Sequence, residues 1–230
     1  PISIRTTEYD IERFGVVFDT NLTLGAHAIS AGFWAETNDF TQGRRFYGLD
    51  NASEPSRRSR AFQTDPFFTQ WRMNFNTDTL QVYLQDQWSI SDAFILTFGF
   101  KGQSVSNASR VDVRTGANPA AGNISSADWF LPQAGVVYRF NDSNELFANY
   151  TENRRAFTSA ATSGPFSTTQ AGFDAIRDTL RPETSTTVEG GLRFGDSALR
   201  GVVAAYYVDF SNRLLALPAG AGVIGNPSVL

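Results

Sequence analysis

The sequence contains no cysteine, and histidine occurs only once, as His27. The missing thiols exclude disulfide bonds, thiolate metal sites and cysteine nucleophiles. With one imidazole and no thiol, a catalytic triad or a zinc site could be assembled only if carboxylates supplied the remaining groups, and a histidine satisfied within the wall is the favoured interpretation. We therefore expect no catalytic residue, no metal site and no cofactor, and we do not expect an enzyme.

Lysine and long apolar runs are also scarce. No stretch of about 18 apolar residues exists, which excludes a transmembrane helix. Nearly all positive charge is arginine and the formal net charge is −4, whereas nucleic-acid-binding domains are usually basic, so no nucleic-acid partner is expected. The chain begins at Pro1 without a signal segment, and we expect residues 1–230 to be an internal piece of a longer protein.

Alternation of apolar and polar residues with a period of two runs through most of the chain. Leu96, Phe98 and Phe100 share one face, whereas Thr97 and Gly99 lie on the other. This period indicates β-strands with one apolar face. It predicts eight strands and the start of a ninth, the eight lying at residues 4–18, 22–37, 73–90, 93–105, 129–140, 144–156, 183–194 and 198–211.

The connections between these strands alternate between short and long. Short turns are expected at residues 19–21, 91–92, 141–144 and 195–197, and long polar loops at 38–72, 106–128 and 157–181. Aromatic residues near the turns, which favour a membrane-interface girdle, are Phe18, Trp88, Phe94, Phe140, Phe147 and Phe194. The layout predicts an all-β, antiparallel up-and-down meander that forms part of a transmembrane β-barrel and is open as given.

Two polar residues, Asp86 and His27, bear on which face of the sheet points to lipid and which to the barrel interior. Asp86 falls on the apolar face of its strand, where either a bulge or a position near the lipid headgroups would accommodate it. The sequence leaves both explanations open. His27 alternates with Thr23 and Gly25 and is expected to face the barrel interior.

Several short segments carry a family resemblance when they are taken in order. They are Tyr83–Trp88, Leu96–Gly99, Pro132–Tyr138, Leu146–Glu152, Leu180–Ser185 and Glu189–Arg193. Their succession across residues 73–215 resembles the barrel of TonB-dependent outer-membrane receptors. Asn153 and Phe157 stand where family members often have Gly and Pro, which leaves the conformation of the following loop open.

The resemblance implies a barrel of about 22 strands, of which this chain supplies eight or nine, without the plug domain and the closing strands. It implies a place in the outer membrane of a Gram-negative cell and active uptake of a ferric siderophore or another small nutrient. The implied partners are TonB, through the absent N-terminal part, outer-membrane lipid and lipopolysaccharide. The alternative is a passive porin or an adhesin-type barrel. A lipid-hydrolysing barrel enzyme and a soluble β-sandwich adhesin are further competitors.

Arginine interleaved with aromatic residues marks two candidate ligand sites. The first lies in the 38–72 stretch and comprises Arg44, Arg45, Tyr47, Arg57, Arg58, Arg60 and Trp71. The second comprises Arg154, Arg155 and Phe157. Guanidinium groups bind carboxylate and phosphate with two parallel hydrogen bonds, so either group could bind an anionic ferric chelate. Contact with lipopolysaccharide phosphates, or simple solvation of the loop, is the competing explanation.

Overall fold

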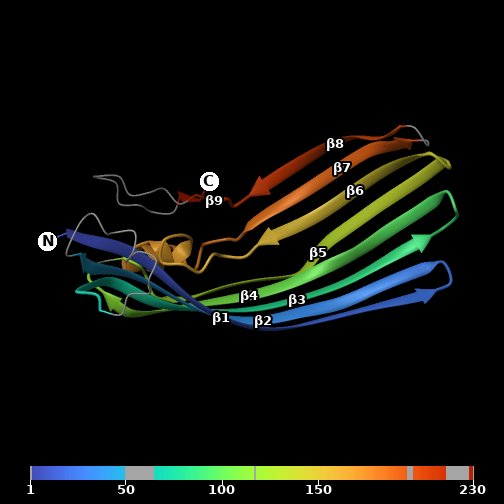
Figure 1. The fold of residues 1–230 in the computed structure, drawn as a ribbon. Helices are drawn as coiled ribbons and strands as arrows, with labels where there is room; N and C mark the ends of the chain where they lie inside the picture. Colours follow the sequence, from blue (N-terminus) through green and yellow to red (C-terminus); the bar gives the residue numbers. More distant parts are fainter. Residues whose placement is uncertain (1, 50–64, 117, 196–198, 216–227, 230) are drawn as a thin grey trace.

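The computed structural model describes residues 2–49, 65–116, 118–195, 199–215 and 228–229. Eight strands form one antiparallel sheet in which each strand pairs with the next along the chain (Figure 1). They are β1 (Ile2–Leu24), β2 (His27–Leu49), β3 (Phe68–Ser89), β4 (Phe94–Arg114), β5 (Gly122–Asn141), β6 (Asn144–Arg155), β7 (Glu183–Gly195) and β8 (Arg200–Ser211). A short pair, β9 (Leu214–Leu215) with β10 (Ser228–Val229), is separate. The predicted antiparallel meander is confirmed.

The strands are longer than the alternation predicted. β1 and β2 each contain 23 residues, and the loops expected at 38–72 and 106–128 are largely continuations of β2, β3, β4 and β5. Residues 50–64 and 117 lie outside the described part. These stretches were predicted to be loops because they are polar. In the structure their polar side chains form hydrogen bonds between strands; for example, the Thr41 hydroxyl donates to Asn74 Oδ1 at 2.6 Å.

The short turns lie together at one end of the sheet (Figure 1). The predicted turn at 19–21 is wrong: these residues belong to β1, and the chain reverses at Gly25, whose φ is +61°. Within β1, Asp19 Oδ1 accepts a hydrogen bond from the Tyr83 hydroxyl and Asn21 Oδ1 accepts one from Ser30. The turns predicted at 91–92 and 141–144 are confirmed, whereas 196–197 lie outside the described residues.

One face of the sheet, called the outer face below, carries an apolar band next to the short turns. Residues opposite each other in the register share a face. The band includes Phe14, Val16, Phe18, Leu22, Leu24, Ile29, Phe33, Leu80, Leu84, Trp88, Leu96, Phe98, Val136, Leu146, Val188, Leu192 and Val203. Phe14 is 73 % exposed, so the face needs an apolar covering. Phe147 departs from the expected girdle because it is buried on the opposite, inner face beside Gly191.

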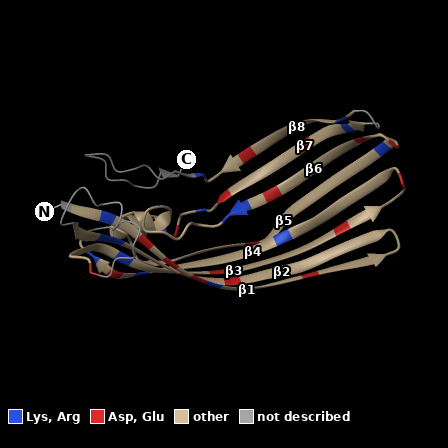
Figure 2. Ribbon diagram, viewed as in Figure 1, with Lys and Arg blue, Asp and Glu red and all other residues tan. Residues whose placement is uncertain are grey.

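The long strands extend well beyond this band. A strand of 23 residues spans roughly 75 Å before tilt, whereas the apolar band of a transmembrane barrel is about 25 Å tall. Figure 2 shows charged residues gathered towards the far ends of β1–β4. The half of each long strand near the turns therefore suits a bilayer, and the other half suits water.

Candidate functional site: the inner wall and its folded connection

The chain between β6 and β7 folds onto the inner face of the sheet, at the end opposite the short turns. It contains the 3-10 helix η1 (Pro165–Ser167) and the helix α2 (Gln170–Ile176), which lies between the β1–β4 and β6–β8 parts of the sheet (Figure 1). Its apolar side chains form a buried cluster with those of the sheet. The members are Trp71, Met73, Phe75, Ala120, Ile124, Phe157, Ala161, Phe166, Phe173 and Leu180. We call residues 157–181 the inner segment.

Hydrogen bonds from glutamine side chains also hold the inner segment. Gln42, only 1 % exposed on β2, accepts a bond from the Ala161 amide at 2.8 Å. The Gln170 side chain bonds both backbone groups of Ala121, each at 2.9 Å. Because these amides satisfy backbone groups that packing has buried, the segment is docked on β2–β5 and not merely draped over them.

Helix α2 has a local start signal. The Thr169 hydroxyl accepts a bond from the Gly172 amide at 3.0 Å, which caps the helix N-terminus. Phe173, on the next turn, points into the cluster and is fully buried. The cap and the buried ring together explain why this short helix forms within a segment that the sequence analysis treated as a loop.

The predicted arginine-aromatic group is divided between the two faces. Arg44 lies on the inner face, with its guanidinium carbon 5.2 Å from the centre of the Trp71 ring. Trp71 belongs to the buried cluster, so Arg44 stands at the edge of the inner segment. The guanidinium is therefore held by a cation–π contact on the wall that faces the barrel interior.

Arg45 and Tyr47 lie on the outer face, beyond the apolar band. Arg45 forms an ion pair with Glu8 at 3.2 Å, and the Tyr47 hydroxyl donates to the same carboxylate. Burial raises the pKa of the Tyr47 hydroxyl, and the hydrogen bond to Glu8 raises it further. Adjacent arginines therefore have different surroundings because successive residues of a strand point to opposite faces. Arg57, Arg58 and Arg60 lie outside the described residues.

The second predicted group is also separated. Phe157 is part of the buried cluster, and Arg155 is exposed at the end of β6. Arg154 donates to the Ala127 carbonyl and lies 3.7 Å from Asp128. These contacts join β5 and β6 beyond Gln133 and Thr151, where their pairing ends.

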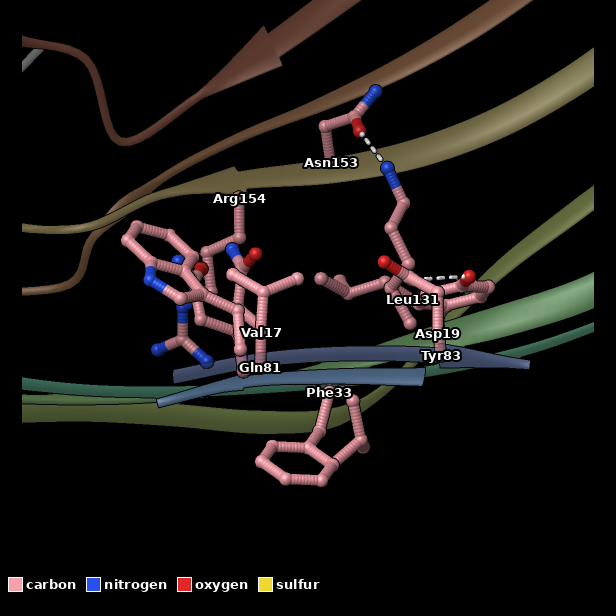
Figure 3. A pocket seen from close by; sticks show the side chains of 13 residues that line it. Val17, Asp19, Phe33, Gln81, Tyr83, Leu131, Asn153 and Arg154 are labelled. Carbon is pink, nitrogen blue, oxygen red and sulfur yellow. Dashed lines mark hydrogen bonds between the residues drawn. The ribbon is translucent and has the colours of Figure 1, made fainter. Parts of the chain in front are cut away.

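Nearer the apolar band, the inner wall holds a pocket of about 240 Å³, lined by apolar side chains such as Trp34 and Leu131 together with polar ones that include Arg154 (Figure 3). Lys101 donates to Asn153 at 3.1 Å, and Tyr83 donates to Asp19 at 2.7 Å. The sequence analysis did not select these four residues. Their only signal was a polar residue at alternate positions of strands whose other face is apolar.

Glycines in the intervening strands permit these long-range contacts. At Gly32, on β2, a Cβ would lie 2.7 Å from the Tyr83 ring and 2.6 Å from Asp19 Oδ1. Any side chain there would block the bond from β3 to β1. On β4, Gly99 likewise lies between Gln85 and Gln133, whose side chains bond at 2.8 Å. The inner wall is thus polar, and its hydrogen bonds pass over glycine positions.

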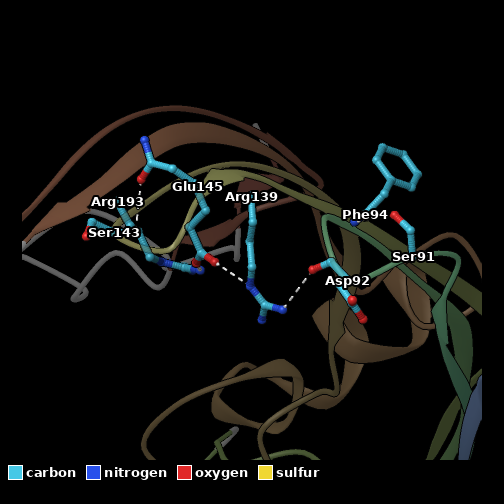
Figure 4. A network of polar contacts seen from close by, with 8 residues as sticks. Ser91, Asp92, Phe94, Arg139, Ser143, Glu145 and Arg193 are labelled. Carbon is cyan, nitrogen blue, oxygen red and sulfur yellow. Dashed lines mark hydrogen bonds and ion pairs between the residues drawn. The ribbon is translucent and has the colours of Figure 1, made fainter.

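A separate ion network lies on the inner side next to the short turns (Figure 4). Glu145 accepts hydrogen bonds from Arg193 at 2.6 Å and from Arg139 at 3.4 Å. Arg139 also donates to the Asp92 carbonyl in the β3–β4 turn. The Arg193 guanidinium stacks 4.3 Å from the centre of the Phe147 ring. The network connects β5, β6 and β7 to a neighbouring turn and so fixes this rim.

Two absences apply to the described part of the chain. No helix there is long and apolar enough to cross a membrane. Nor do those residues include a group of three or more histidine and carboxylate side chains that could hold a metal ion.

The chain resembles known proteins in sequence pattern and in fold. A model of the family described as TonB dependent receptor-like, beta-barrel, matches residues 3–228. No curated protein matches the sequence. One similar solved structure is the copper transporter OprC, with a TM-score of 0.69 and 16 % identity over 91 % of this chain and 31 % of that one. A second is the ferric citrate transporter FecA in its unliganded form, with a TM-score of 0.65 and 16 % identity over 92 % of this chain and 29 % of that one. A third is the ferripyoverdine receptor of the outer membrane of Pseudomonas aeruginosa, with a TM-score of 0.62 and 16 % identity over 98 % of this chain and 29 % of that one.

The chain therefore spans about 30 % of the length of these receptors. Identities this low establish the fold alone, whereas the family match extends over nearly the whole chain. TonB-dependent receptors are outer-membrane transporters and not enzymes. The predicted resemblance is confirmed: this chain belongs to the TonB-dependent receptor family and forms part of its β-barrel.

Proposed function

We propose that this chain is a section of the barrel wall of a receptor for active uptake of a ferric siderophore or a similar iron complex. The observation that carries the proposal is the family match over residues 3–228. FecA and the ferripyoverdine receptor, two of the similar structures, are named for iron complexes. OprC is named as a copper transporter, so the transported metal is a point that the experiments must decide.

The rest of the receptor is part of the same proposal. A plug domain and further strands complete the barrel to about 22 strands, and TonB supplies energy through the N-terminal part. Outer-membrane lipid surrounds the apolar band. Lipopolysaccharide stands against the polar outer face beyond it, where Arg45 and Tyr47 lie.

Arg44 is the inner-wall residue best suited to contact an anionic chelate at the far end of the barrel. Its guanidinium lies against Trp71, and its buried Nε has no hydrogen-bond partner among the described residues. Arg154 and Lys101 both line the pocket of the inner wall, so the passage carries positive groups besides Arg44. The remaining loop arginines, Arg57, Arg58 and Arg60, complete the proposed ligand set together with Arg155.

Uptake of radiolabelled ferric chelates by cells that express the full receptor tests this proposal. Arg44→Ser should weaken binding of an anionic chelate by about tenfold, which corresponds to one charge-assisted contact. Arg45→Ser is the matched control because Arg45 neighbours Arg44 in sequence but pairs with Glu8 on the outer face. Equal uptake by both variants and the wild type, for every chelate tried, would remove Arg44 from the ligand site.

Energy dependence separates the proposal from the porin alternative. Uptake through a TonB-dependent receptor should stop when tonB is deleted or a protonophore is added, whereas flux through a passive porin should continue. Labelled copper, supplied in parallel, decides whether iron is the transported metal. Continued uptake of the chelate without TonB would overturn the proposal.

A further inference from the structure

The single histidine lies on the outer face, in contrast to the sequence expectation. His27 is opposite Trp88 in the β2–β3 register, and the two rings stack at 5.3 Å with an interplanar angle of 16°. Trp88 shares this face with Leu84 and Leu80 of the apolar band. His27 therefore faces the surroundings of the barrel and not its interior.

His27 is paired with Asp86, a carboxylate that the strand register places on the same face as the apolar band. Its Nδ1 lies 2.7 Å from Asp86 Oδ2. Asp86 is opposite Ile29 and Phe98, and the β2–β3 register is regular at this position, so the bulge that the sequence left open is absent from this part of the sheet. Neither apolar neighbour offers a polar group. A carboxylate on a lipid-facing surface is costly, and the imidazole offsets that cost.

One polar atom of each side chain, Asp86 Oδ1 and His27 Nε2, takes no part in the contact between them. Asp86 has a side chain 16 % exposed, and its Oδ1 has no hydrogen-bond partner within the part of the chain that the structure describes. The His27 side chain is 40 % exposed, and its only polar contact in the described structure is through Nδ1. When Nδ1 donates to the carboxylate, Nε2 is the remaining polar atom of the ring. The protonated ring has an N–H there to donate.

The height of the pair in the membrane suggests what that group meets. His27 is the first residue of β2, directly after the turn at Gly25, and Trp88 is the second-last residue of β3. Tryptophan at such a position is typical of the membrane interface, at the level of the headgroups. Asp86 lies two residues deeper. The exposed edge of the imidazole is therefore at the depth of the lipid phosphates.

We propose that His27, held by Asp86 and stacked on Trp88, binds the phosphodiester of a glycerophospholipid in the leaflet next to the short turns. The ring donates Nδ1–H to Asp86 and Nε2–H to a phosphate oxygen. This arrangement uses the ring with a proton on both nitrogens, which places it between a carboxylate and a phosphate at a low-dielectric boundary where charge-assisted hydrogen bonds are strong. The proposal rests on the membrane location of the family and is independent of which nutrient is transported.

Lipid binding to the full receptor, purified in detergent and followed by native mass spectrometry, tests the proposal. Phosphatidylglycerol and phosphatidylethanolamine are compared with galactosyl diacylglycerol of the same acyl chains, which has no phosphate. Wild-type receptor should retain at least one more phospholipid than galactolipid under matched conditions. Equal retention of all three lipids by the wild type would overturn the proposal without reference to any variant.

Variants then locate the site. His27→Gln should weaken binding of the retained phospholipid by about tenfold, as expected for the loss of one hydrogen bond to a charged group. Asp86→Asn should weaken it less because the ring remains on Trp88. Gln87→Ala, on the inner face of the same strand, is the matched control and should bind like the wild type. Unchanged affinity in folded His27→Gln receptor would overturn the assignment.

Inorganic phosphate distinguishes the lipid from a free anion. Millimolar phosphate should leave phospholipid retention unchanged because most of the lipid's affinity comes from its acyl chains along the apolar band. Displacement of the lipid by phosphate at these concentrations would instead identify a soluble-anion site and overturn the lipid assignment. Iron uptake by the His27→Gln receptor should remain normal, so a failure of the lipid site is distinguishable from a failure of the proposed transport function.

Discussion

Replacing Phe173 with alanine should release the inner segment from the sheet while the barrel wall remains intact. Phe173 is fully buried on α2 and stacks on Phe166 with ring centres 5.2 Å apart. Phe166 in turn contacts Phe75 of β3 at 5.8 Å. Residue 122 is a glycine, and a Cβ at this position would lie only 2.5 Å from the Phe173 ring, so the absence of a side chain makes space for the ring. The Phe173 ring is thus a central connection between the inner segment and the wall.

The expected magnitude follows from the size of the lost side chain. A buried Phe→Ala change typically costs about 3–5 kcal/mol because it removes apolar burial and leaves a cavity. Here the cost should fall on docking of the segment, since the ring packs in the cluster that joins the inner segment to β3–β5. Each 1.4 kcal/mol corresponds to about tenfold in an equilibrium, so local opening should become at least about a hundredfold more frequent.

Hydrogen–deuterium exchange of the full receptor in nanodiscs measures this opening. Peptides covering 157–181 should exchange much faster in Phe173→Ala, whereas those from β7 and β8 should not change. Ala175→Ser, on the exposed side of α2, controls for mutation of the helix. Wild-type exchange in 157–181, or equal acceleration throughout the sheet, would contradict the view that this cluster holds the segment locally.

Two further changes test the contacts around this cluster and within the wall. Gln42→Leu should leave the Ala161 amide unpaired and cost about 1–3 kcal/mol of local stability, seen as faster exchange near Ala161 with a normal melting temperature of the barrel. Gly99→Val should lower the temperature at which heat-modifiable gel migration is lost, because its Cβ would lie 2.3 Å from the Leu84 carbonyl oxygen. Gly116→Val is the control, because a Cβ at Gly116 would meet nothing within 4 Å. If both variants lost heat-modifiable migration at the same temperature, the inference that β3 lies too close to Gly99 for a side chain would be contradicted.

Much of the candidate site depends on which face each side chain occupies. Alternation assigned faces correctly within several strands that have one apolar face, as for Leu96 and Phe98 in β4. It could not separate Arg44 from Arg45, because the 38–72 stretch is polar on both faces and was interpreted as a loop. Once that stretch is known to be a strand, the two arginines must point in opposite directions.

The errors share a physical cause. The Asp19 and Asn21 side chains suggested a turn because such residues are common in turns, but in β1 they are bonded to Tyr83 and Ser30 of other strands. His27 was assigned by counting from residues across the real turn at Gly25, which breaks the alternation. Contacts that join distant parts of the chain leave no local signal.

The sequence by itself determined the antiparallel meander, the apolar band and the family, since each follows from local alternation and the order of short segments. The tertiary structure decided where the strands end, how the inner segment folds onto β2–β5, and that His27 meets Asp86 at the lipid face. Strand extension beyond the bilayer needs only hydrogen bonds between polar neighbours. Docking of residues 157–181 needs apolar partners such as Met73 and Phe75, far away in sequence, and only the assembled sheet brings them together.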